Sequence, residues 1–310
     1  MKNFAFVFPG QGSQAVGMMN AFIDTPGVRQ VFQEASDALG QDVWALVAEG
    51  PGEALNSTVN TQPVMLTAGY AVYRAWLDGG GASPAVVAGH SLGEYTALVA
   101  AGALAFADAV KLVRFRAQAM QEAVPVGSGA MAAVMGVSDE AVHDACREAA
   151  QGEVVEAVNF NAPSQVVIAG HKNAVERAAA LAKKAGARRA VMLPVSAPFH
   201  SSLLRPAAEK LAQYLQDVQV QPPAVPVVNN VDVATVSEPA AIKAALSRQA
   251  ASPVRWVEVI QRISRLGVTD VAECGPGKVL AGLTRRIDPA LASHAITEPE
   301  SLTQALEALR

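Results

Sequence analysis

A serine between two glycines is the strongest indication of chemistry in this 310-residue sequence. Residues 89–93 read Gly-His-Ser-Leu-Gly and fit the pattern Gly-x-Ser-x-Gly. This pattern places a serine on a sharp strand-to-helix turn, where its hydroxyl is exposed and the helix N-terminus supplies N–H groups and positive potential. The apolar run 85–88 precedes the turn, and an Ala-rich helical pattern follows it. Ser91 is therefore predicted to be a nucleophile. The structural alternative is that Ser91 only caps a helix at a tight turn.

A serine hydroxyl needs a base, and the sequence offers five histidines. His143 falls in a polar helical pattern and His171 in a predicted turn, so both are expected at the solvent. His294 has no motif around it. His90 is expected to pack, because neighbours at an elbow point in different directions. His200 lies where a small domain should return to a large one, and pockets form at such interfaces. The residues alone leave the choice of His200 as the base open.

A second glycine-rich turn follows the first apolar run of the chain. Gly10, Gly12 and Ala15 fit Gly-x-Gly-x-x-Ala, which is typical of dinucleotide binding. That interpretation requires an acidic residue at the end of a second strand about 20 residues later. Glu34 and Asp37 lie instead in an amphipathic helical pattern. A backbone N–H directed at an oxyanion is the better use of this turn.

The composition excludes several classes of function. Half of the residues are apolar (51%) and 17% are charged, which favours a folded protein with a large core over a disordered one. The net charge of −4 and a pI near 5.8 provide no basic field for nucleic acid or for an anionic membrane. Cys146 and Cys274 lack metal-ligand spacing, so reduced thiols are expected, with a disulfide as the alternative. The apolar run 4–8 is too short for a signal peptide, and no stretch is long enough to span a membrane. A soluble, cytoplasmic protein is expected.

The nucleophile turn belongs to an alternation of strands and helices. Apolar runs at 4–8 and 85–88 predict buried strands, and helical patterns cover 28–39 and 63–77. Such alternation favours a parallel α/β sheet. We expect an α/β fold, with a larger α/β-hydrolase-like domain and an inserted smaller one.

The middle of the chain has a different order of elements. From residue 127 to 196 it reads strand, helix, strand, strand, helix, strand, over 130–137, 139–150, 154–159, 165–169, 174–185 and 188–195. This is the order of a ferredoxin-like unit. We therefore expect 1–127 and 197–310 to form the large catalytic domain and 128–196 an inserted ferredoxin-like domain, with hinges at 127–129 and 196–198. Strands at 226–230 and 268–272 then return to the large domain.

Three segments together resemble the malonyl-CoA:acyl carrier protein transacylases of bacterial fatty-acid synthesis. They are Gly-Gln-Gly-Ser-Gln at 10–14, Gly-His-Ser-Leu-Gly-Glu-Tyr at 89–95 and Phe-His-Ser at 199–201. Further stretches carry the same resemblance across nearly the whole chain: 116–121, 159–161, 165–170, 228–232 and 273–278.

The resemblance implies a role for each residue of the reaction centre. Ser91 would be the nucleophile, and His200 would be its general base and then the acid that protonates the leaving thiol. The backbone N–H groups of Gln11 and Leu92 would form the oxyanion hole. A backbone carbonyl near Gln249 would orient the histidine in place of a triad carboxylate, which agrees with the lack of an obvious third acid in the sequence.

The resemblance also implies a substrate. Arg116 would bind the free carboxylate of the malonyl group, because a guanidinium offers two parallel donors and an ammonium does not. Arg114, two positions away, should point to the opposite helix face. Gln249, Met120 and Phe199 would also contact substrate, and Leu92 with Phe199 resembles the malonyl-preferring pattern. Many bacterial relatives have a small residue where Phe199 stands, so Phe199 alone does not decide the substrate.

Malonyl-CoA and an acyl carrier protein are the implied partners, and the coenzyme A thioester is a substrate, so no cofactor or metal is expected. Carrier proteins are acidic, and three basic clusters are candidates for docking: 183–184, 188–189 and 285–286. A monomer is expected, with neither nucleic acid nor membrane as a partner. Three alternatives stay open: a serine hydrolase acting on esters or thioesters, a non-catalytic carrier-binding module, and a free-standing acyltransferase of a polyketide pathway.

Overall fold

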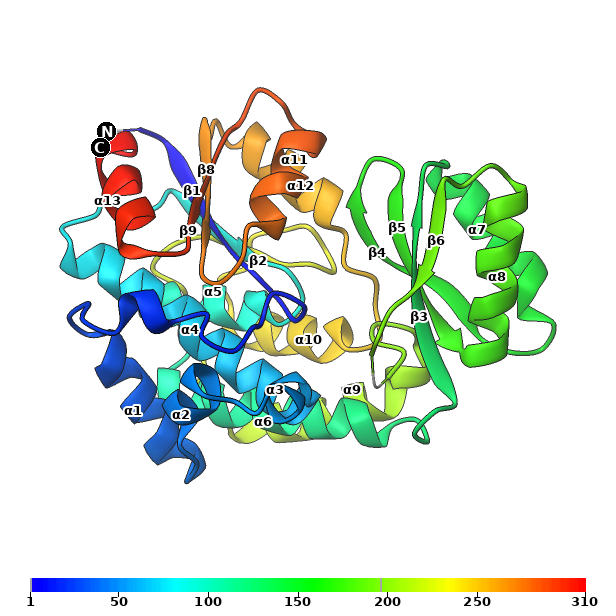
Figure 1. Cartoon of the computed structure of the whole chain (residues 1–310), viewed down its shortest axis with the longest axis horizontal. Coiled ribbons are helices and arrows are strands. Elements are labelled where there is room, and N and C mark those ends of the chain that lie inside the picture. Colours follow the sequence, from blue (N-terminus) through cyan, green and yellow to red (C-terminus); the bar gives the residue numbers. More distant parts are fainter. Residues whose placement is uncertain (1, 196) are drawn as a thin grey trace.

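A five-stranded parallel sheet forms the centre of the larger lobe (Figure 1). The computed structural model describes residues 2–195 and 197–310. In spatial order the strands are β7 (Val227–Val228), β2 (Val86–Gly89), β1 (Phe4–Phe8), β8 (Asp270–Cys274) and β9 (Ala292–Ile296). Strand β1 lies in the middle and is buried along its whole length, as is typical of a parallel sheet covered on both faces.

The side chains of β1 alternate between two hydrophobic cores. Phe6 packs edge-on against Trp76, with ring centroids 5.1 Å apart, in one core. Ala5 and Val7 belong to the core on the opposite face, which also contains Trp256. The helices of this lobe are α1 (Val28–Leu39), α2 (Val43–Ala48), α3 (Gly52–Asn56), α4 (Thr58–Asp78), α5 (Gly93–Ala100), α6 (Phe106–Glu122), α9 (Arg205–Asp217), α10 (Pro239–Gln249), α11 (Trp256–Arg265), α12 (Val279–Ile287) and α13 (Pro299–Ala308). Short 3-10 turns lie at η1 (Asn20–Phe22) and η2 (Ser202–Leu204).

The smaller lobe is a four-stranded antiparallel sheet with two helices on one face (Figure 1). Its elements in chain order are β3 (Gly129–Met135), α7 (Asp139–Ala150), β4 (Val155–Ala162), β5 (Gln165–His171), α8 (Lys172–Lys184) and β6 (Arg189–Met192). The strand order β4-β5-β3-β6 and the chain order of elements are those of a ferredoxin-like unit. The opposite face of this sheet contributes Met131 and Val167 to the core of the larger lobe, so the two lobes pack together.

These two sheets confirm the predicted fold class, a mixed α/β protein with a parallel sheet and a separate antiparallel sheet. The proposed division at residues 127–128 and 196–197 stays a prediction, and Ser196 lies outside the described residues. Within the part of the chain that the structure describes, no helix is both long enough and apolar enough to cross a bilayer.

One predicted helix has the wrong start. The pattern at 63–77 treats Pro63 as the first helical residue, where the missing N–H would cost nothing. The structure begins this helix at Thr58 and places Pro63 in its second turn. Thr61 and Gln62 are buried there, and this packing offsets the hydrogen bond that proline removes.

Strand ends also differ from the pattern. The run 226–230 contains a strand of two residues, and the run 268–272 is shifted to 270–274. The last strand of the small lobe covers 189–192 rather than 188–195. Strand β9 has no continuous apolar run and was not predicted, because it lies at the sheet edge and is half-exposed.

Candidate active site

Ser91 lies on a strained turn at the carboxyl end of β2. Its φ of 51° is in the left-handed region, which non-glycine residues rarely adopt. The flanking glycines allow this turn because no side chain fits there. A Cβ on Gly89 would lie 1.9 Å from backbone atoms of Gly93, and a Cβ on Gly93 would lie 2.1 Å from the carbonyl oxygen of Phe8. Left-handed backbone at a non-glycine residue is characteristic of functional sites.

The pairing of β1 with β2 brings the two predicted oxyanion donors to one sheet edge. The register places Phe8 beside Gly89. Gln11 follows Phe8 by three residues, and Leu92 follows Gly89 by three, so both come from turns that leave adjacent strand ends. Both residues line the same cavity.

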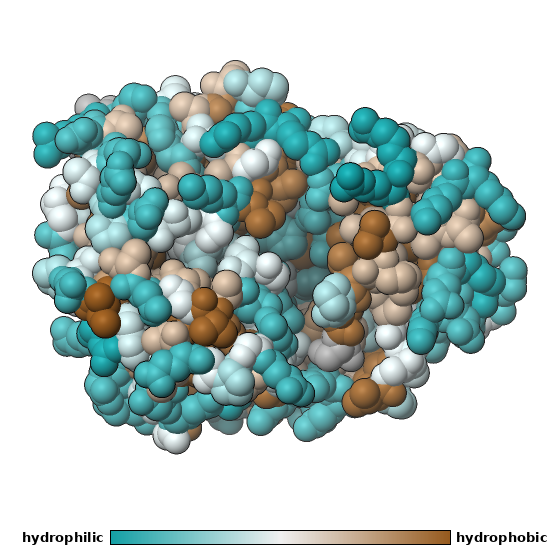
Figure 2. Space-filling view, viewed as in Figure 1, coloured by the Kyte–Doolittle hydropathy of each residue, from teal (hydrophilic) through white to brown (hydrophobic). Residues whose placement is uncertain are grey.

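This cavity has a volume of about 590 Å³ and lies between the two lobes, where Figure 2 shows a hollow. Its walls include the following predicted site residues: Gln11, Ser91, Leu92, Arg116, Met120, Phe199 and His200. The small lobe contributes Met131, Asn159 and the segment 193–195 to the same walls. The cavity is therefore shaped by both lobes, and the remaining predicted site residue, Gln249, contacts Arg116 and His200 of its wall.

His200 faces Ser91 across a short hydrogen bond. Its Nε2 lies 2.7 Å from Ser91 Oγ, and its Nδ1 lies 2.9 Å from the backbone oxygen of Gln249. A carbonyl oxygen accepts only, so Nδ1 carries the hydrogen and Nε2 is the free acceptor. The backbone of His200 is also left-handed, with a φ of 67°. Burial, reinforced by the positive charge of Arg116, lowers the pKa of His200 to about 3.

Arg116 extends from α6 to the same serine. Its Nη2 donates to Ser91 Oγ at 3.0 Å and to Gln249 Oε1 at 2.9 Å, and its Nη1 donates to Gln62 Oε1 at 2.8 Å. The guanidinium lies 5.2 Å from the ring centroid of Tyr95, a cation–π distance. Only 1% of Arg116 is exposed, and this burial lowers its pKa. The result is a cation held beside the nucleophile by neutral acceptors.

Arg114 points away from the site, as its spacing predicts. Its Nη2 donates to Gln41 Oε1 at 2.6 Å, on the opposite side of α6. Met120, one turn further along the same helix as Arg116, accepts a weak hydrogen bond from Gln62 Nε2 at Sδ. That contact fixes which end of the Gln62 amide faces Arg116.

The side chain of Gln249 is a feature that the sequence reasoning did not identify. Nε2 of this fully buried residue donates to the backbone oxygen of Ser91 at 3.0 Å and to Glu94 Oε2 at 2.8 Å. The family resemblance pointed to its backbone carbonyl and to contact with substrate, but not to these two side-chain hydrogen bonds. Glu94 was not identified either, although a carboxylate in an otherwise apolar eight-residue helix was a visible signal.

Asn230 hydrogen-bonds to the backbone of the nucleophile turn. Its Oδ1 accepts from Ser91 N at 2.7 Å, and its Nδ2 donates to the backbone oxygen of Gly89 at 2.7 Å. Asn230 is fully buried, and its own backbone N–H donates to Glu94 Oε2 at 2.9 Å. The Asn230 side chain thus joins the end of β2 at Gly89 to the backbone N–H of the strained serine.

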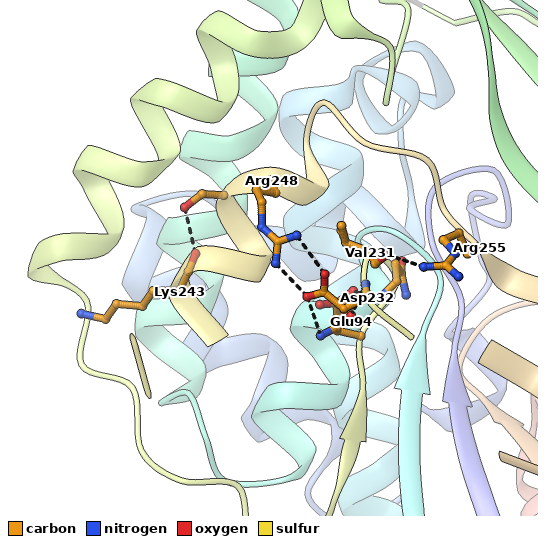
Figure 3. Close-up of polar contacts among 9 residues, drawn as sticks. Glu94, Val231, Asp232, Lys243, Arg248 and Arg255 are labelled. Carbon is orange, nitrogen blue, oxygen red and sulfur yellow. Dashed lines mark hydrogen bonds and ion pairs between the residues drawn. The ribbon is translucent and has the colours of Figure 1, made fainter. Parts of the chain in front are cut away.

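The loop that carries Asn230 is fixed by two arginines (Figure 3). Arg248, in α10, forms a two-pronged pair with Asp232, with distances of 2.9 and 2.7 Å. Arg255 donates to the backbone oxygen of Val231 at 3.0 Å. Glu94 and Asp232 are both labelled in Figure 3, and the negative charge of Asp232 contributes to raising the pKa of Glu94. The loop therefore connects α10 and the start of α11 to the nucleophile turn.

The remaining histidines are not at the reaction centre. His90 Nε2 lies 2.8 Å from Asn161 Oδ1 of β4, so the residue packs, as predicted, and also links the lobes. His143 is exposed, as predicted, with its ring 5.7 Å from that of Phe160. His171 is the last residue of β5 rather than part of a turn, and it is half-exposed, with its Nδ1 accepting from the backbone N–H of Val154.

Among the described residues, no group of three or more His, Cys, Asp or Glu side chains is arranged to hold a metal ion. Cys146 and Cys274 are buried free thiols. The arrangement of Ser91, His200 and two turn backbones can form and break an ester on the serine, and Arg116 adds a fixed positive charge for an anionic acyl group.

Comparisons with known proteins agree with this geometry. The sequence profile of the acyl transferase domain matches residues 5–286. The malonyl CoA-acyl carrier protein transacylase of Escherichia coli K12 is 55% identical over 308 residues, which cover 99% of this chain and 100% of that protein. An acyl-carrier-protein S-malonyltransferase structure from Burkholderia pseudomallei has 66% identity and a TM-score of 0.97, covering 99% of this chain and 100% of that one. A malonyl-transacylase solved in complex with a type II polyketide synthase acyl carrier protein has 51% identity and a TM-score of 0.98, covering 99% and 100%.

Proposed function

We infer that this chain, which belongs to the acyl transferase family of malonyl-CoA:acyl carrier protein transacylases, transfers a malonyl group from coenzyme A to the thiol of an acyl carrier protein. Such a transfer supplies extender units for fatty-acid synthesis. The observation that carries the assignment is the buried Arg116 guanidinium, 3.0 Å from the Oγ that His200 contacts. A carboxylated acyl group on Ser91 would meet a positive charge at that place.

The first half of the reaction makes the acyl-enzyme. Ser91 Oγ attacks the thioester carbon while its proton moves to His200 Nε2. The negative charge on the substrate oxygen is stabilised by the backbone N–H groups of Gln11 and Leu92, which we propose as the oxyanion hole. The C–S bond then breaks, His200 returns the proton to the coenzyme A thiolate, and a malonyl ester of Ser91 is left.

The second half reverses these roles with another thiol. The carrier-protein thiol gives its proton to His200 and attacks the ester carbon, and the oxyanion forms at the same place. Ser91 leaves with the proton from His200, so the enzyme is regenerated and the malonyl group is bound as a thioester. Gln249 holds Nδ1–H of His200 throughout, which keeps Nε2 directed at the serine.

Arg116 would bind the malonyl carboxylate through its two terminal nitrogens. In the free enzyme these nitrogens donate to Gln62, Gln249 and Ser91, all neutral acceptors. An ionised carboxylate is a stronger acceptor than a hydroxyl, so it would displace the Ser91 contact. Phe199 and Met120 are the apolar walls that we propose beside the acyl group.

The other properties that we propose rest on chemistry within one chain. Every proposed site residue belongs to the same chain, which supports a monomer. Side chains and backbone donors account for each step, so no cofactor is needed. A net charge of −4 argues against nucleic acid as a partner, and use of coenzyme A thioesters supports a cytoplasmic location. We retain residues 128–196 as an inserted domain because one face of its sheet packs with α7 and α8 in a separate core.

The basic clusters considered for carrier docking differ in their surroundings. Arg286 donates to the backbone oxygen of Pro163 and to Gln165, and Arg285 donates to the backbone oxygen of Ser293. These arginines therefore already connect parts of the chain. Residues 183–184 and 188–189 belong to the small lobe, which also contributes to the cavity wall.

Mass spectrometry of the intact protein tests the assignment directly. Incubation with malonyl-CoA should add one malonyl group, located on Ser91 by peptide mapping, and Ser91→Ala should remain unmodified. Addition of phosphopantetheinylated carrier protein should clear the adduct and give malonyl-carrier protein. An adduct that decays at the same rate without carrier protein would indicate a hydrolase instead.

A further inference from the structure

Glu94 is a buried carboxylate that the reaction described above does not use. It lies in the first turn of α5, three residues after Ser91, and is 2% exposed. Burial raises its pKa to about 7, against the opposing effects of its hydrogen bonds and of Arg116. Burial of an ionisable group is costly unless the group is hydrogen-bonded, so the partners of Glu94 account for its presence here.

The contacts of Glu94 show what that task is. One oxygen, Oε2, accepts from the Gln249 amide at 2.8 Å and from the backbone N–H of Asn230 at 2.9 Å. Both partners contact the nucleophile turn, Gln249 through the backbone oxygen of Ser91 and Asn230 through the Ser91 N–H.

Gln249 serves the site through two separate groups. Its backbone oxygen accepts from His200, and its side-chain Oε1 accepts from Arg116. The backbone contact does not depend on how the amide is turned. The side-chain contact does, because an amide turned by 180° would place NH₂ against the donor-only guanidinium of Arg116.

We propose that Glu94 is a positioning residue for carboxylated acyl groups: it holds the NH₂ end of the Gln249 amide, so that Oε1 of this amide faces Arg116 and fixes the guanidinium where the malonyl carboxylate binds. The inference rests on the proposed malonyl transfer. It separates two tasks at one residue, since the Gln249 carbonyl supports the chemistry of any acyl group, whereas the contacts of the Gln249 amide with Glu94 and Arg116 support only an acyl group that Arg116 recognises.

The test compares malonyl-CoA with acetyl-CoA, which carries the same thioester without a carboxylate. Glu94→Leu removes the acceptor at similar volume and should lower kcat/KM for malonyl-CoA about 30-fold, the usual scale for a hydrogen bond to a charged group. The loss for acetyl-CoA should stay below about 3-fold, because the His200–Gln249 carbonyl contact remains and the Asn230 side chain still holds Ser91 N and Gly89 O. Glu94→Gln should restore most of the malonyl rate, since an amide oxygen can accept both hydrogen bonds.

Gln249→Leu provides a second variant that keeps the backbone carbonyl. It should show the same selective loss, and the double variant Glu94→Leu/Gln249→Leu should be no worse than Gln249→Leu alone, because both act on Arg116 through one amide. Glu273→Leu is the matched control, since Glu273 is also a fully buried carboxylate but receives its hydrogen bond from Ala281 N of α12. It should lower the melting temperature without changing the ratio of malonyl to acetyl rates.

Equal losses for both thioesters in Glu94→Leu and Gln249→Leu, or additive losses in the double variant, would overturn the inference. A wild-type protein that acquires no malonyl group on Ser91 would overturn the proposed function and this inference together. If the wild-type protein is loaded normally but the variants lose malonyl and acetyl activity equally, only the role of Glu94 would be overturned.

Discussion

His200 donates its Nδ1–H to the backbone oxygen of Gln249 at 2.9 Å, in the position where a serine–histidine–acid triad has a carboxylate. A neutral carbonyl orients the imidazole but adds no negative charge to stabilise its protonated form. The positive charge on the other side, Arg116, opposes protonation further. His200 is therefore held as a neutral base.

Because His200 stays neutral in this environment, the rate of malonyl loading should vary little with pH on the acid side of neutrality. The pKa of His200 is lowered from 6.5 to about 3, so its base form persists far below neutral pH. The rate of malonyl loading, measured by rapid quench between pH 5 and 8, should not show a loss with a midpoint near 6.5. Such a midpoint would mean that His200 titrates like an exposed histidine.

The same pKa shift affects the free energy of unfolding. The stability contributed by neutral His200 is present above pH 6.5 and is lost as the pH falls toward 3.

Replacement of Arg116 should separate acyl groups by charge. Arg116→Ala should lower kcat/KM for malonyl-CoA by about 100-fold or more, because a charge-assisted, two-pronged contact is lost. The value of kcat/KM for acetyl-CoA should fall much less. Arg116→Lys should recover little of the malonyl rate, since an ammonium cannot donate to Gln62, Gln249 and a carboxylate in the same plane.

The control for this experiment is Arg114→Ala, on the opposite face of the same helix. Arg114 contacts Gln41 and should leave the ratio of malonyl to acetyl rates unchanged. Equal losses for both substrates in Arg116→Ala would remove the role of this arginine as a carboxylate clamp.

The fold could be predicted from the sequence where the pattern is local. Strand β1 and helix α1 have the predicted bounds, because an apolar run closed by Pro-Gly and an amphipathic stretch ending at Gly40 are local signals. The start of α4 and the edge strand β9 could not be predicted, because burial by distant elements decides them. Pro63 inside a helix is tolerated only because the surrounding turns are packed.

The candidate site shows a similar division. Ser91 could be located from its own pentapeptide, and Arg116 and Gln249 from a family resemblance. The network that connects them could not be found from the sequence. Glu94 lies more than 130 residues before Asn230, and Asn230 lies 19 residues before Gln249. Which end of an amide faces which partner depends on three-dimensional contacts that no sequence pattern records.

Asn230→Ala should weaken the nucleophile turn without regard to the acyl group. The Asn230 side chain supports the left-handed backbone of Ser91 through two hydrogen bonds of 2.7 Å, one from the Ser91 N–H and one to the backbone oxygen of Gly89. Loss of these buried hydrogen bonds should cost about 2–3 kcal/mol of stability. It should also lower kcat for malonyl-CoA and acetyl-CoA by similar factors. Chemical denaturation and steady-state kinetics measure the two effects, and a selective loss of malonyl activity would contradict this role.

Phe199→Ala should widen the acyl end of the cavity. Phe199 is 9% exposed and lines the cavity next to His200. A branched α-carbon needs the space that this ring occupies, so the ratio of methylmalonyl to malonyl loading should rise about 10-fold or more, on the scale of one methyl group in a tight pocket. Competition between the two thioesters, read by the mass of the acyl-enzyme, measures the ratio directly. Malonyl loading by Met120→Ala shows how far a general loss of cavity shape affects the rate. An unchanged ratio of methylmalonyl to malonyl loading in Phe199→Ala would mean that the methyl branch does not lie against this ring.

Glu273 should make the protein less stable as the pH rises. It is fully buried at the end of β8, and burial raises its pKa from 4.5 to about 7 despite hydrogen bonds from the first N–H groups of α12. Between these values the folded chain retains a proton that the unfolded chain releases, so the free energy of unfolding falls as the pH increases through this range. Glu273→Gln keeps an acceptor for Ala281 N but cannot ionise. Urea denaturation at pH 5 and pH 8 should therefore show the variant gaining stability relative to the wild type, on the order of 2 kcal/mol, at the higher pH. A difference that is the same at both pH values would mean that Glu273 is ionised in the folded protein throughout.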